Sequence, residues 1–477
     1  MGVTRKDALR ILGGTGVAAA AAALAPGSAA SASPAHPASA SGEGAGGGAI
    51  RRDVCVIGGG SSGTYAAVRL RDLGHSVAVV ERAGRLGGHT ETYHDPATGG
   101  STDVGVLIYH DMPLVRDYFG RFDVPLVRYT GQGGTANHYV DFRTGLVVPG
   151  YTPPAPAALP AYVALLQRYP YLDQGFELPD PVPAELLLPF GEFAVRHGLE
   201  SIVQLLFGYG QGLGDILRIP AIYVLKNVSL SVINSVLTGS LLITERRDNS
   251  ELYEKATAFL GPDVLLGATV RSVHRGPHGV QVLVTTADGP RVILCRRLVV
   301  TAPPLLSTFD GFDLDATERA IFGRFRHHHY WTAVARLSGM PAGVSLVNVG
   351  ADTPYNLAPL PGFYGLTVTG VPDLWGVKYG SDGQIADATV RAAIVAGIER
   401  LRTAGSYPVE LDGLEFFKAH NPFELVVRPG DIAGGFYRRL YGLQGRNNTF
   451  YTGAAFHTHD SSLLWRFTEE LLPRIAA

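Results

Sequence analysis

Residues 53–70, DVCVIGGGSSGTYAAVRL, contain two motifs that require the same backbone shape. Residues 58–63 form a G-x-G-x-x-G motif, which binds dinucleotide phosphates. Gly59, Ser61 and Gly63 form a G-x-S-x-G motif, the pattern of a hydrolase nucleophile elbow. Both motifs need a strand, a sharp turn and a helix, so the neighbouring sequence must decide between them.

The surrounding residues favour a dinucleotide. The apolar residues 53–57 predict a buried parallel strand, and residues 62–73 have the apolar spacing of a helix. Residues 75–81, HSVAVVE, predict a second strand that ends at Glu81, where an acid accepts ribose hydroxyls. A nucleophile elbow normally follows several strands, whereas only a leader precedes this turn. We therefore interpret the stretch as a βαβ unit in which Ser61 faces phosphate.

A second glycine loop, RLGG at residues 85–88, follows Glu81 closely. Two such loops suit one pyrophosphate in a cofactor that lies extended through its domain. The arrangement resembles the flavin amine-oxidase superfamily, in which R-x-G-G follows the acidic residue at this distance and the cofactor is FAD. That superfamily usually has arginine after the glycine pair. This chain has His89 there, which leaves open whether the flavin is linked covalently to a histidine.

Three later segments resemble the same superfamily. Residues 266–286 resemble the part that returns to the flavin domain, where Val270 contacts the adenine end through its backbone. Residues 296–304 resemble the strand that runs into a proline-containing turn, and residues 442–472 resemble the last flavin motif with its final helix. The superfamily usually places an acid where Ala454 stands in this chain.

The resemblance implies an α/β fold class, with a doubly wound, Rossmann-like FAD-binding domain and an inserted α+β substrate domain. We expect the FAD domain to comprise residues 50–110, 251–310 and 426–477, and the substrate domain to comprise residues 111–250 and 311–425. The residues expected to contact FAD are Gly58, Gly60, Ser61, Ser62, Gly63, Glu81, Arg82, Arg85, Gly87, Gly88, His89, Thr90, Val270, Gly453, Ala454 and Ser462.

Two groups within the superfamily resemble this chain more closely. Residues 186–212, 219–228 and 443–453 resemble flavin-dependent polyunsaturated fatty-acid isomerases, which move double bonds without net redox change. Residues 58–70, 85–93 and 453–469 resemble fungal β-cyclopiazonate dehydrogenase-like FAD oxidoreductases, which act oxidatively on an alkaloid precursor. In both groups a hydride leaves an activated C–H bond of a hydrophobic substrate for flavin N5.

The first hypothesis for function is an FAD-dependent oxidoreductase that acts on a small hydrophobic substrate, an amine or a secondary metabolite, with O2 as a candidate electron acceptor. The alternative is a redox-neutral, flavin-dependent isomerase of unsaturated fatty acids. A third hypothesis, a non-enzymatic flavoprotein, has the least support, because three separate segments resemble flavin contacts. A fatty acid would need a cationic clamp, for which Arg128 is a candidate.

His457 and His459 are the candidate catalytic residues, because the last flavin motif places them beside the flavin ring. On an extended stretch both would face one side, where one could act as an acid or base or stabilise the reduced flavin. The alternative is a structural histidine bonded to Asp460 or to backbone. Phe207 and Tyr209 are expected to line an apolar substrate pocket, as is Tyr223 in the next segment, with packing in the core as the alternative.

We expect no metal site. The stretch RHHHYW, residues 326–331, contains three consecutive histidines, which cannot all point the same way on a strand or a helix. No cysteine or carboxylate lies nearby at ligand spacing, so a cluster at the surface or at a cavity rim is the preferred interpretation. Cys55 and Cys295 each lie in an apolar run and are expected to be buried, reduced thiols.

The length of 477 residues favours two domains, and the net charge of −2 argues against nucleic acid as a partner. Residues 1–49 have the order of an export signal: a basic start, a short apolar run and small residues. Arg5-Lys6 resembles a twin-arginine signal with lysine in the second place, so we expect a periplasmic or extracellular protein. No other segment is expected to span the membrane, and the oligomeric state stays open.

Overall fold

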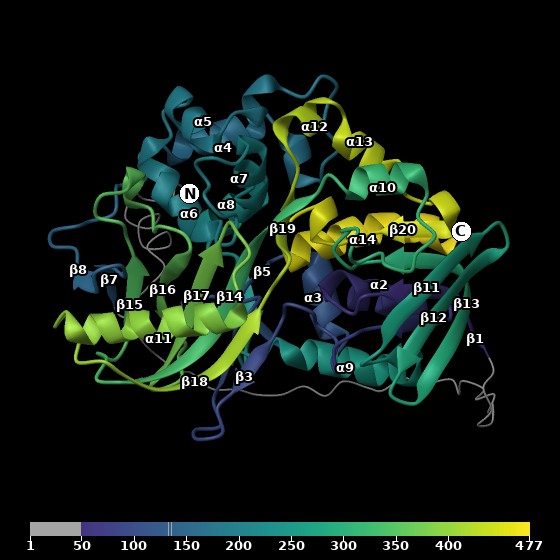
Figure 1. Ribbon diagram of the computed structural model, residues 1–477, viewed down its shortest axis with the longest axis horizontal. Coiled ribbons are helices and arrows are strands. Elements are labelled where there is room, and N and C mark those ends of the chain that lie inside the picture. Colours follow the sequence, from purple (N-terminus) through teal and green to yellow (C-terminus); the bar gives the residue numbers. More distant parts are fainter. Residues whose placement is uncertain (1–48, 132, 135) are drawn as a thin grey trace, which may run out of the picture.

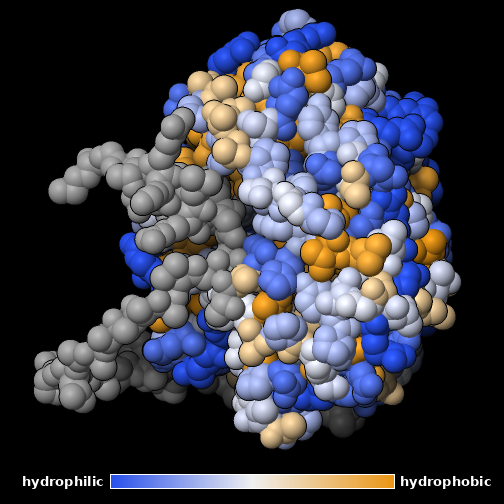
Figure 2. Space-filling model, turned by 90° about the vertical axis from the view of Figure 1, so that its left-hand side faces the viewer, coloured by the Kyte–Doolittle hydropathy of each residue, from blue (hydrophilic) through white to orange (hydrophobic). Residues whose placement is uncertain are grey.

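The computed structural model describes residues 49–131, 133–134 and 136–477. The predicted export signal therefore lies outside the described residues, except for Ala49. Two sheets dominate the structure, and helices lie against both of them (Figure 1). On the face shown in Figure 2, hydrophobic residues form small patches between hydrophilic ones.

The first sheet contains four parallel strands in the order β10-β2-β1-β13. Their bounds are β1 (Ile50–Ile57), β2 (Val77–Val80), β10 (Val264–Leu265) and β13 (Gly289–Val300). The C-terminal half of β1 and all of β2 are buried, as the continuous apolar runs predict for strands covered on both faces. Cys55 and Cys295 are free, buried thiols on the neighbouring strands β1 and β13, as expected.

The far edge of β13 has two partners. β12 (Gly279–Thr286) pairs antiparallel with the first half of β13, and β11 (Thr269–Gly276) lies beyond it. β20 (Thr449–Tyr451) pairs parallel with the last three residues of β13. The carboxyl ends of β1, β13 and β20 therefore meet at one edge, where ligands bind in α/β sheets.

Helices complete the α/β unit around this sheet. α2 (Ser61–Asp72) contacts β1 and β2 and packs against α14 (Ser461–Ala476). α9 (Ser250–Leu260) also contacts α2, and α3 (Pro113–Gly120) contacts α14 (Figure 1). The predicted α/β fold class is confirmed.

The second, larger sheet has the strand order β18-β14-β17-β16-β15-β7-β8, with β19 also paired to β14. Its strands are β7 (Ala136–Asp141), β8 (Leu146–Val147), β14 (Arg326–Ser338), β15 (Val344–Asn348), β16 (Gly362–Val368), β17 (Leu374–Ser381), β18 (Glu410–Ala419) and β19 (Phe423–Val426). α11 (Asp387–Thr403) covers one face of this sheet. Trp331 and Val377 of the sheet and Ile394 of α11 belong to a separate hydrophobic core between them. Alternate strand residues point away from α11.

A layer of short helices lies beyond the large sheet (Figure 1). They are α4 (Leu159–Gln167), α5 (Phe190–Arg196), α6 (Val203–Tyr209), α7 (Ala221–Asn227) and α8 (Leu230–Thr238). The window Ala221–Thr238 is long and apolar enough to cross a membrane, and it is the one such window in the described residues. It folds as two helices, α7 and α8, and 56% of it is buried within the protein, as in a core segment.

Short elements connect these layers. The hairpin of β3 (Thr92–His94) and β4 (Ser101–Asp103) precedes a small sheet of β5 (Tyr109–His110), β9 (Leu241–Thr244) and β6 (Leu126–Arg128). The remaining helices include α10 (Ala316–Phe322), α12 (Pro429–Ala433) and α13 (Phe436–Tyr441). Strands of the large sheet come from both segments assigned to the substrate domain, and the domain boundaries themselves stay a prediction.

A buried ion pair ties β11 to α10. The Arg275 guanidinium donates to both carboxylate oxygens of Glu318, at 2.6 and 2.8 Å, and both side chains are 1% exposed. The Tyr451 hydroxyl also donates to Glu318, at 2.9 Å. This network holds the edge of the first sheet against α10 and β20.

We expect Glu318→Gln to lower the free energy of unfolding by about 1.5–3 kcal/mol, because it removes one of the two carboxylates that pair with the buried Arg275 guanidinium and leaves the pair with Asp313. The midpoint of urea unfolding, followed by tryptophan fluorescence, measures the effect. Arg402→Ala is the control, since its ion pair with Glu399 on α11 is exposed and its loss should leave the midpoint unchanged. Equal midpoints for Glu318→Gln and the wild type would contradict this account of the network.

Candidate functional site

The two predicted glycine loops are in direct contact. The Gly87 amide donates to the Gly59 carbonyl at 2.8 Å, and Gly60 and Gly87 form a parallel bridge. Gly88 has a φ of +58°, and a Cβ there would lie 2.9 Å from the Gly60 Cα. Any side chain at Gly88 would push the loops apart, so the contact with the first loop requires glycine at this position.

A second close approach lies at the carboxyl ends of the parallel strands. A Cβ on Gly63 would lie 1.9 Å from the Gly58 carbonyl oxygen, so only glycine lets α2 start this close to β1. The Thr301 hydroxyl after β13 donates to the same carbonyl at 2.9 Å. A Cβ on Gly453, which follows β20, would lie 3.0 Å from the Thr301 carbonyl oxygen. Three predicted cofactor segments thus meet at one point.

Glu81 lies where the sequence predicts the ribose-binding acid, at the end of β2. Its buried carboxylate accepts from the Gly59 amide and from the Ala83 amide, each at 2.7 Å. Its backbone carbonyl accepts from Ala268, two residues before Val270 on β11. Glu81 is therefore fixed to the first glycine loop through its carboxylate and to the residues before β11 through its backbone carbonyl.

The basic residues of the second loop have different surroundings. Arg82 is exposed. Arg85 donates to the carbonyls of Leu86 and Thr90 at 2.8 Å and to that of Gly88 at 2.9 Å. The Arg85 guanidinium also pairs with Glu91, while the Thr90 side chain is buried. Arg85 thus fixes the shape of the loop through its carbonyls.

The N-termini of two helices meet beside these loops. The Ser61 hydroxyl, at the start of α2, donates to the Ser461 hydroxyl, at the start of α14, at 3.0 Å. Asp460 caps α14 by accepting from the Leu463 amide at 3.0 Å. The amide of His110 donates to Ser462 Oγ at 3.0 Å. Helix N-termini attract anions, so this junction is suited to phosphate and to the electron-rich edge of a reduced flavin.

The junction fits a dinucleotide. Ser62 Oγ is buried and has no hydrogen-bond partner in the part of the chain that the structure describes. A Cβ built on Gly60 would meet nothing nearer than the Gly88 Cα, at 3.9 Å, so the backbone there can approach a ligand. An unpaired hydroxyl, free amides and an open backbone surface are what a pyrophosphate requires. The fit supports the predicted FAD contacts.

Five aromatic rings gather next to the glycine loops, and we call them the ring cluster: His89, Tyr330, His420, Phe423 and His459. His89 stacks on His420 with ring centroids 4.6 Å apart, and its centroid lies 6.0 Å from that of His459. Phe423 stacks on His459 at 4.1 Å and on Tyr330 at 4.9 Å. The rings come from the second glycine loop, the large sheet and the segment before α14, so the cluster joins the FAD-type sheet to the large sheet.

The histidines of the ring cluster are neutral. Burial lowers the pKa of His459 to about 3 and that of His89 to about 4, and it also lowers the pKa of His420. His459 Nε2 accepts from the Glu424 amide at 3.2 Å, so the ring proton lies on Nδ1. His459 is therefore an uncharged ring that could donate one hydrogen bond, and it does not serve as an imidazolium acid near neutral pH.

His457 lies apart from His459, contrary to the expectation that both face one side. His457 Nδ1 is 3.4 Å from Lys226 Nζ, and its Nε2 is 3.3 Å from the Asp173 carbonyl oxygen. The segment between β20 and α14 is a 3-10 turn, Ala454–Phe456, followed by the cap at Asp460, so the alternation of an extended chain does not apply. His457 belongs to a buried polar contact under the helical layer.

The predicted substrate residues have different surroundings. The ring centroids of Phe207 and Tyr364 are 5.2 Å apart, and those of Tyr364 and Tyr330 are 6.1 Å apart. Phe207 therefore extends the ring cluster. The Tyr223 hydroxyl accepts from the Val427 amide at 2.8 Å and lies 2.8 Å from the Tyr437 hydroxyl, which are contacts of the core. Tyr209 is partly buried, and burial raises its pKa to about 12.

Arg128 is exposed, and it donates to the Gly239 carbonyl at 2.9 Å. It is not part of the ring cluster. The members of the cluster that sequence reasoning missed are Tyr330, His420 and Phe423. The signal for Tyr330 was present in RHHHYW, because strand alternation in β14 turns it away from the core under α11.

The other residues of that stretch do not gather into a metal site. The rings of His327 and His329 lie 4.7 Å apart, while His328 Nδ1 lies 3.5 Å from Asp382. Within residues 49–477, apart from the undescribed positions 132 and 135, no group of three or more His, Cys, Asp or Glu side chains could hold a metal ion.

The chain is similar to known flavoproteins in sequence and in fold. The family model for flavin containing amine oxidoreductases matches residues 61–310. An FAD-dependent oxidoreductase of Cochliobolus heterostrophus is 37% identical over 90% of this chain and 92% of its own length. The β-cyclopiazonate dehydrogenase of Aspergillus oryzae is 35% identical over 90% of this chain and 94% of its own.

Solved structures share the fold. A fatty acid isomerase of P. acnes that produces CLA aligns with a TM-score of 0.69 and 21% identity, over 89% of this chain and 98% of its own. A putrescine oxidase aligns with a TM-score of 0.64 and 17% identity, over 90% and 99% of the two chains.

We expect Gly88→Ala to weaken FAD binding by about tenfold or more, because left-handed backbone strain and the approach to Gly60 cost about 1–3 kcal/mol. The ratio of flavin to protein absorbance after dialysis measures retention. Gly84→Ala is the control, since a Cβ at Gly84 meets nothing within 4 Å. Equal loss of flavin from both variants would contradict the contact between the loops.

We expect acid to destabilise the protein partly through His459. Its pKa is about 3 when folded and near 6.5 when unfolded, so its contribution to stability is complete above pH 6.5 and falls as the pH drops toward 3. In His459→Gln the side-chain amide can still accept from the Glu424 amide. Between about pH 7 and about pH 5, the free energy of unfolding of the wild type should fall by about 2 kcal/mol more than that of this variant. Urea unfolding at the two pH values measures both changes, and an equal fall in the two proteins would refute the prediction.

Proposed function

The chain belongs to the flavin-containing amine oxidoreductase family and is an FAD-dependent oxidoreductase, and we propose that it oxidises a small hydrophobic amine or secondary metabolite by removing a hydride from an activated C–H bond. When bound, FAD supplies the hydride acceptor at its N5 atom. Support for this substrate class comes from relatives such as the β-cyclopiazonate dehydrogenase, which is 35% identical over most of both chains.

The observation that carries the proposal is the position of the ring cluster directly after the second glycine loop. Gly87 and Gly88 contact the first loop, and the next residue, His89, is already part of the cluster. A cofactor whose pyrophosphate lies on the loops would therefore extend toward His89 and the rings beyond it.

The chain's own residues would perform three tasks. The glycine loops, Glu81 and the junction of α2 with α14 would hold the cofactor. The ring cluster would hold an apolar substrate and exclude water, since its histidines are neutral and its other members are apolar or phenolic. Phe207 and Tyr364 would extend that surface toward the helical layer.

We expect anaerobic mixing of the holoenzyme with its substrate to bleach the flavin, and air to restore the colour. A panel of hydrophobic amines, aromatic secondary metabolites and unsaturated fatty acids would be tested, and the flavin spectrum and the ultraviolet absorbance of the substrate would be recorded together. Lasting bleaching means that the hydride stays on the flavin until an acceptor takes it. Recovery in air identifies O2 as a competent acceptor.

One result would contradict the proposal and favour the isomerase. In that result, the absorbance of a conjugated diene grows over many turnovers with a fatty acid, and the flavin is oxidised at the end of the reaction. That result means that the hydride returns to the substrate. Oxidised free FAD mixed with the same panel is the control for reactions that do not need the protein.

A further inference from the structure

A buried chain of hydrogen bonds joins His110 on β5 to Ser235 on α8 and to Asp460. The Nδ1 atom of His110 lies 2.7 Å from the Ser235 hydroxyl, and its Nε2 atom lies 2.9 Å from a carboxylate oxygen of Asp460. The His110 side chain is 5% exposed, whereas Ser235 is only partly buried. The ring therefore links Asp460 to a hydroxyl that lies nearer to solvent than the ring itself.

This chain ends at the junction of α2 with α14. Asp460 caps α14, and the backbone amide of His110 donates to Ser462 Oγ at 3.0 Å. Ser461, which lies between these two residues, bonds to Ser61 at the start of α2. His110 is thus held at the junction through both its ring and its backbone, so negative charge bound there acts on it over a short distance.

The strand order indicates which part of an extended dinucleotide would lie near this chain. Glu81, the acid expected at the ribose, ends β2, and the first glycine loop follows β1, its neighbour in the sheet. Asp460 follows β20, which lies beyond β13 on the opposite side from β2. A cofactor with its ribose at Glu81 and its pyrophosphate on the loops would therefore have its flavin end toward Asp460 and His110.

Reduction changes the charge at that end. A hydride brings two electrons and one proton, so it adds one negative charge to the bound cofactor, and unbalanced charge is costly in an enclosed site. Burial opposes protonation of His110, but Asp460 and, to a smaller extent, Asp173 favour it. Together with the opposing charge of Arg466, they raise the pKa of His110 above its usual value.

We propose that His110 takes up one proton when FAD is reduced, so that the His110–Asp460 pair balances the charge that the hydride brings. The proposal rests on FAD binding and on no particular substrate. Before uptake, the Nε2–H group donates to Asp460, and Nδ1 accepts from the Ser235 hydroxyl. Uptake forms an N–H bond at Nδ1, because Ser235 passes its hydrogen to the ring and recovers one from water. The resulting hydroxide is neutralised by the buffer, and Asp460 stays ionised beside the imidazolium.

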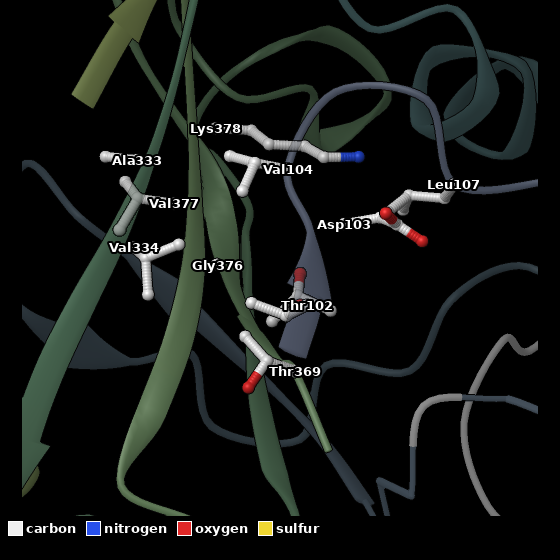
Figure 3. Close-up of a pocket in the computed structure, with 11 residues that line it drawn as sticks. Thr102, Asp103, Val104, Leu107, Ala333, Val334, Thr369, Gly376, Val377 and Lys378 are labelled. Carbon is white, nitrogen blue, oxygen red and sulfur yellow. The ribbon is translucent and has the colours of Figure 1, made fainter. Parts of the chain in front are cut away.

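Asp103 is the other group near the junction that could take up this proton. Burial raises the pKa of Tyr109, the neighbour of His110, and both Asp103 and Asp460 add to that rise. Burial also raises the pKa of Asp103 to about 7, against two hydrogen bonds that favour its carboxylate. Asp103 lines a recess of about 40 Å³ beside the large sheet, which has room for water but not for a substrate (Figure 3). Substitution of each group separates the two possibilities.

Spectroelectrochemical titration of the holoenzyme between about pH 6 and about pH 9 provides the test. Each proton taken up with two electrons shifts the reduction equilibrium tenfold per pH unit, which corresponds to about 30 mV. The flavin potential of the wild type should fall more steeply with pH than that of His110→Gln, by up to this amount, because glutamine cannot take up the proton. The wild type should also have the higher potential at about pH 7, and the two potentials should converge as the pH rises and His110 becomes neutral in both states.

Asp460→Asn should also flatten the slope, since asparagine still caps a helix but no longer stabilises an imidazolium. His94→Gln is the first control, because His94 makes the same kind of contact, with Asp248 at 2.8 Å, but is 57% exposed. Asp103→Asn is the second control. Both controls should keep the slope of the wild type.

Equal slopes in the wild type and in His110→Gln would overturn the proposal. A slope that is lost in Asp103→Asn but kept in His110→Gln would assign the proton to Asp103 instead. Flavin absorbance after dialysis shows that each variant holds FAD, and Asp460→Asn provides the same comparison if His110→Gln does not. Because the electrode supplies the electrons, this test is separate from the proposed oxidation, which fails only if no compound in the substrate panel bleaches the flavin.

Discussion

The contact between the two glycine loops sets the positions of the predicted cofactor segments and of the ring cluster. Gly88 approaches Gly60 so closely, in a left-handed conformation, that the second loop could not carry a side chain at that point. Glu81 is locked to the first loop through the Gly59 amide, and Arg85 holds the carbonyls of the second. Because the loops are fixed to each other, the direction of the chain after them is also fixed, and His89 enters the ring cluster.

The same constraint explains why distant segments build one site. The ends of β1, β13 and β20 meet around Thr301, which contacts Gly58 and approaches Gly453. The large sheet contributes Tyr330 from the face that α11 leaves free. One sheet therefore carries the proposed cofactor cradle, the other carries the proposed substrate surface, and the ring cluster joins the two sheets.

The sequence predicted the local part of this arrangement well. Glycine spacing, strand length and the position of Glu81 depend on neighbouring residues, so a βαβ unit could be derived from them. The ring cluster could not, since Phe423, His420 and Tyr330 meet His89 only through the fold of the large sheet. The pairing of His457 with His459 was wrong for a related reason: a 3-10 turn and a helix cap replace the extended chain on which it depended.

Calorimetric titration of the apoprotein with FAD and with NAD tests whether the two loops and the junction of α2 with α14 form one dinucleotide cradle for FAD. We predict binding of one FAD for each chain and no measurable heat from NAD under the same conditions. Binding of NAD in place of FAD, or of neither by folded apoprotein, would contradict the account.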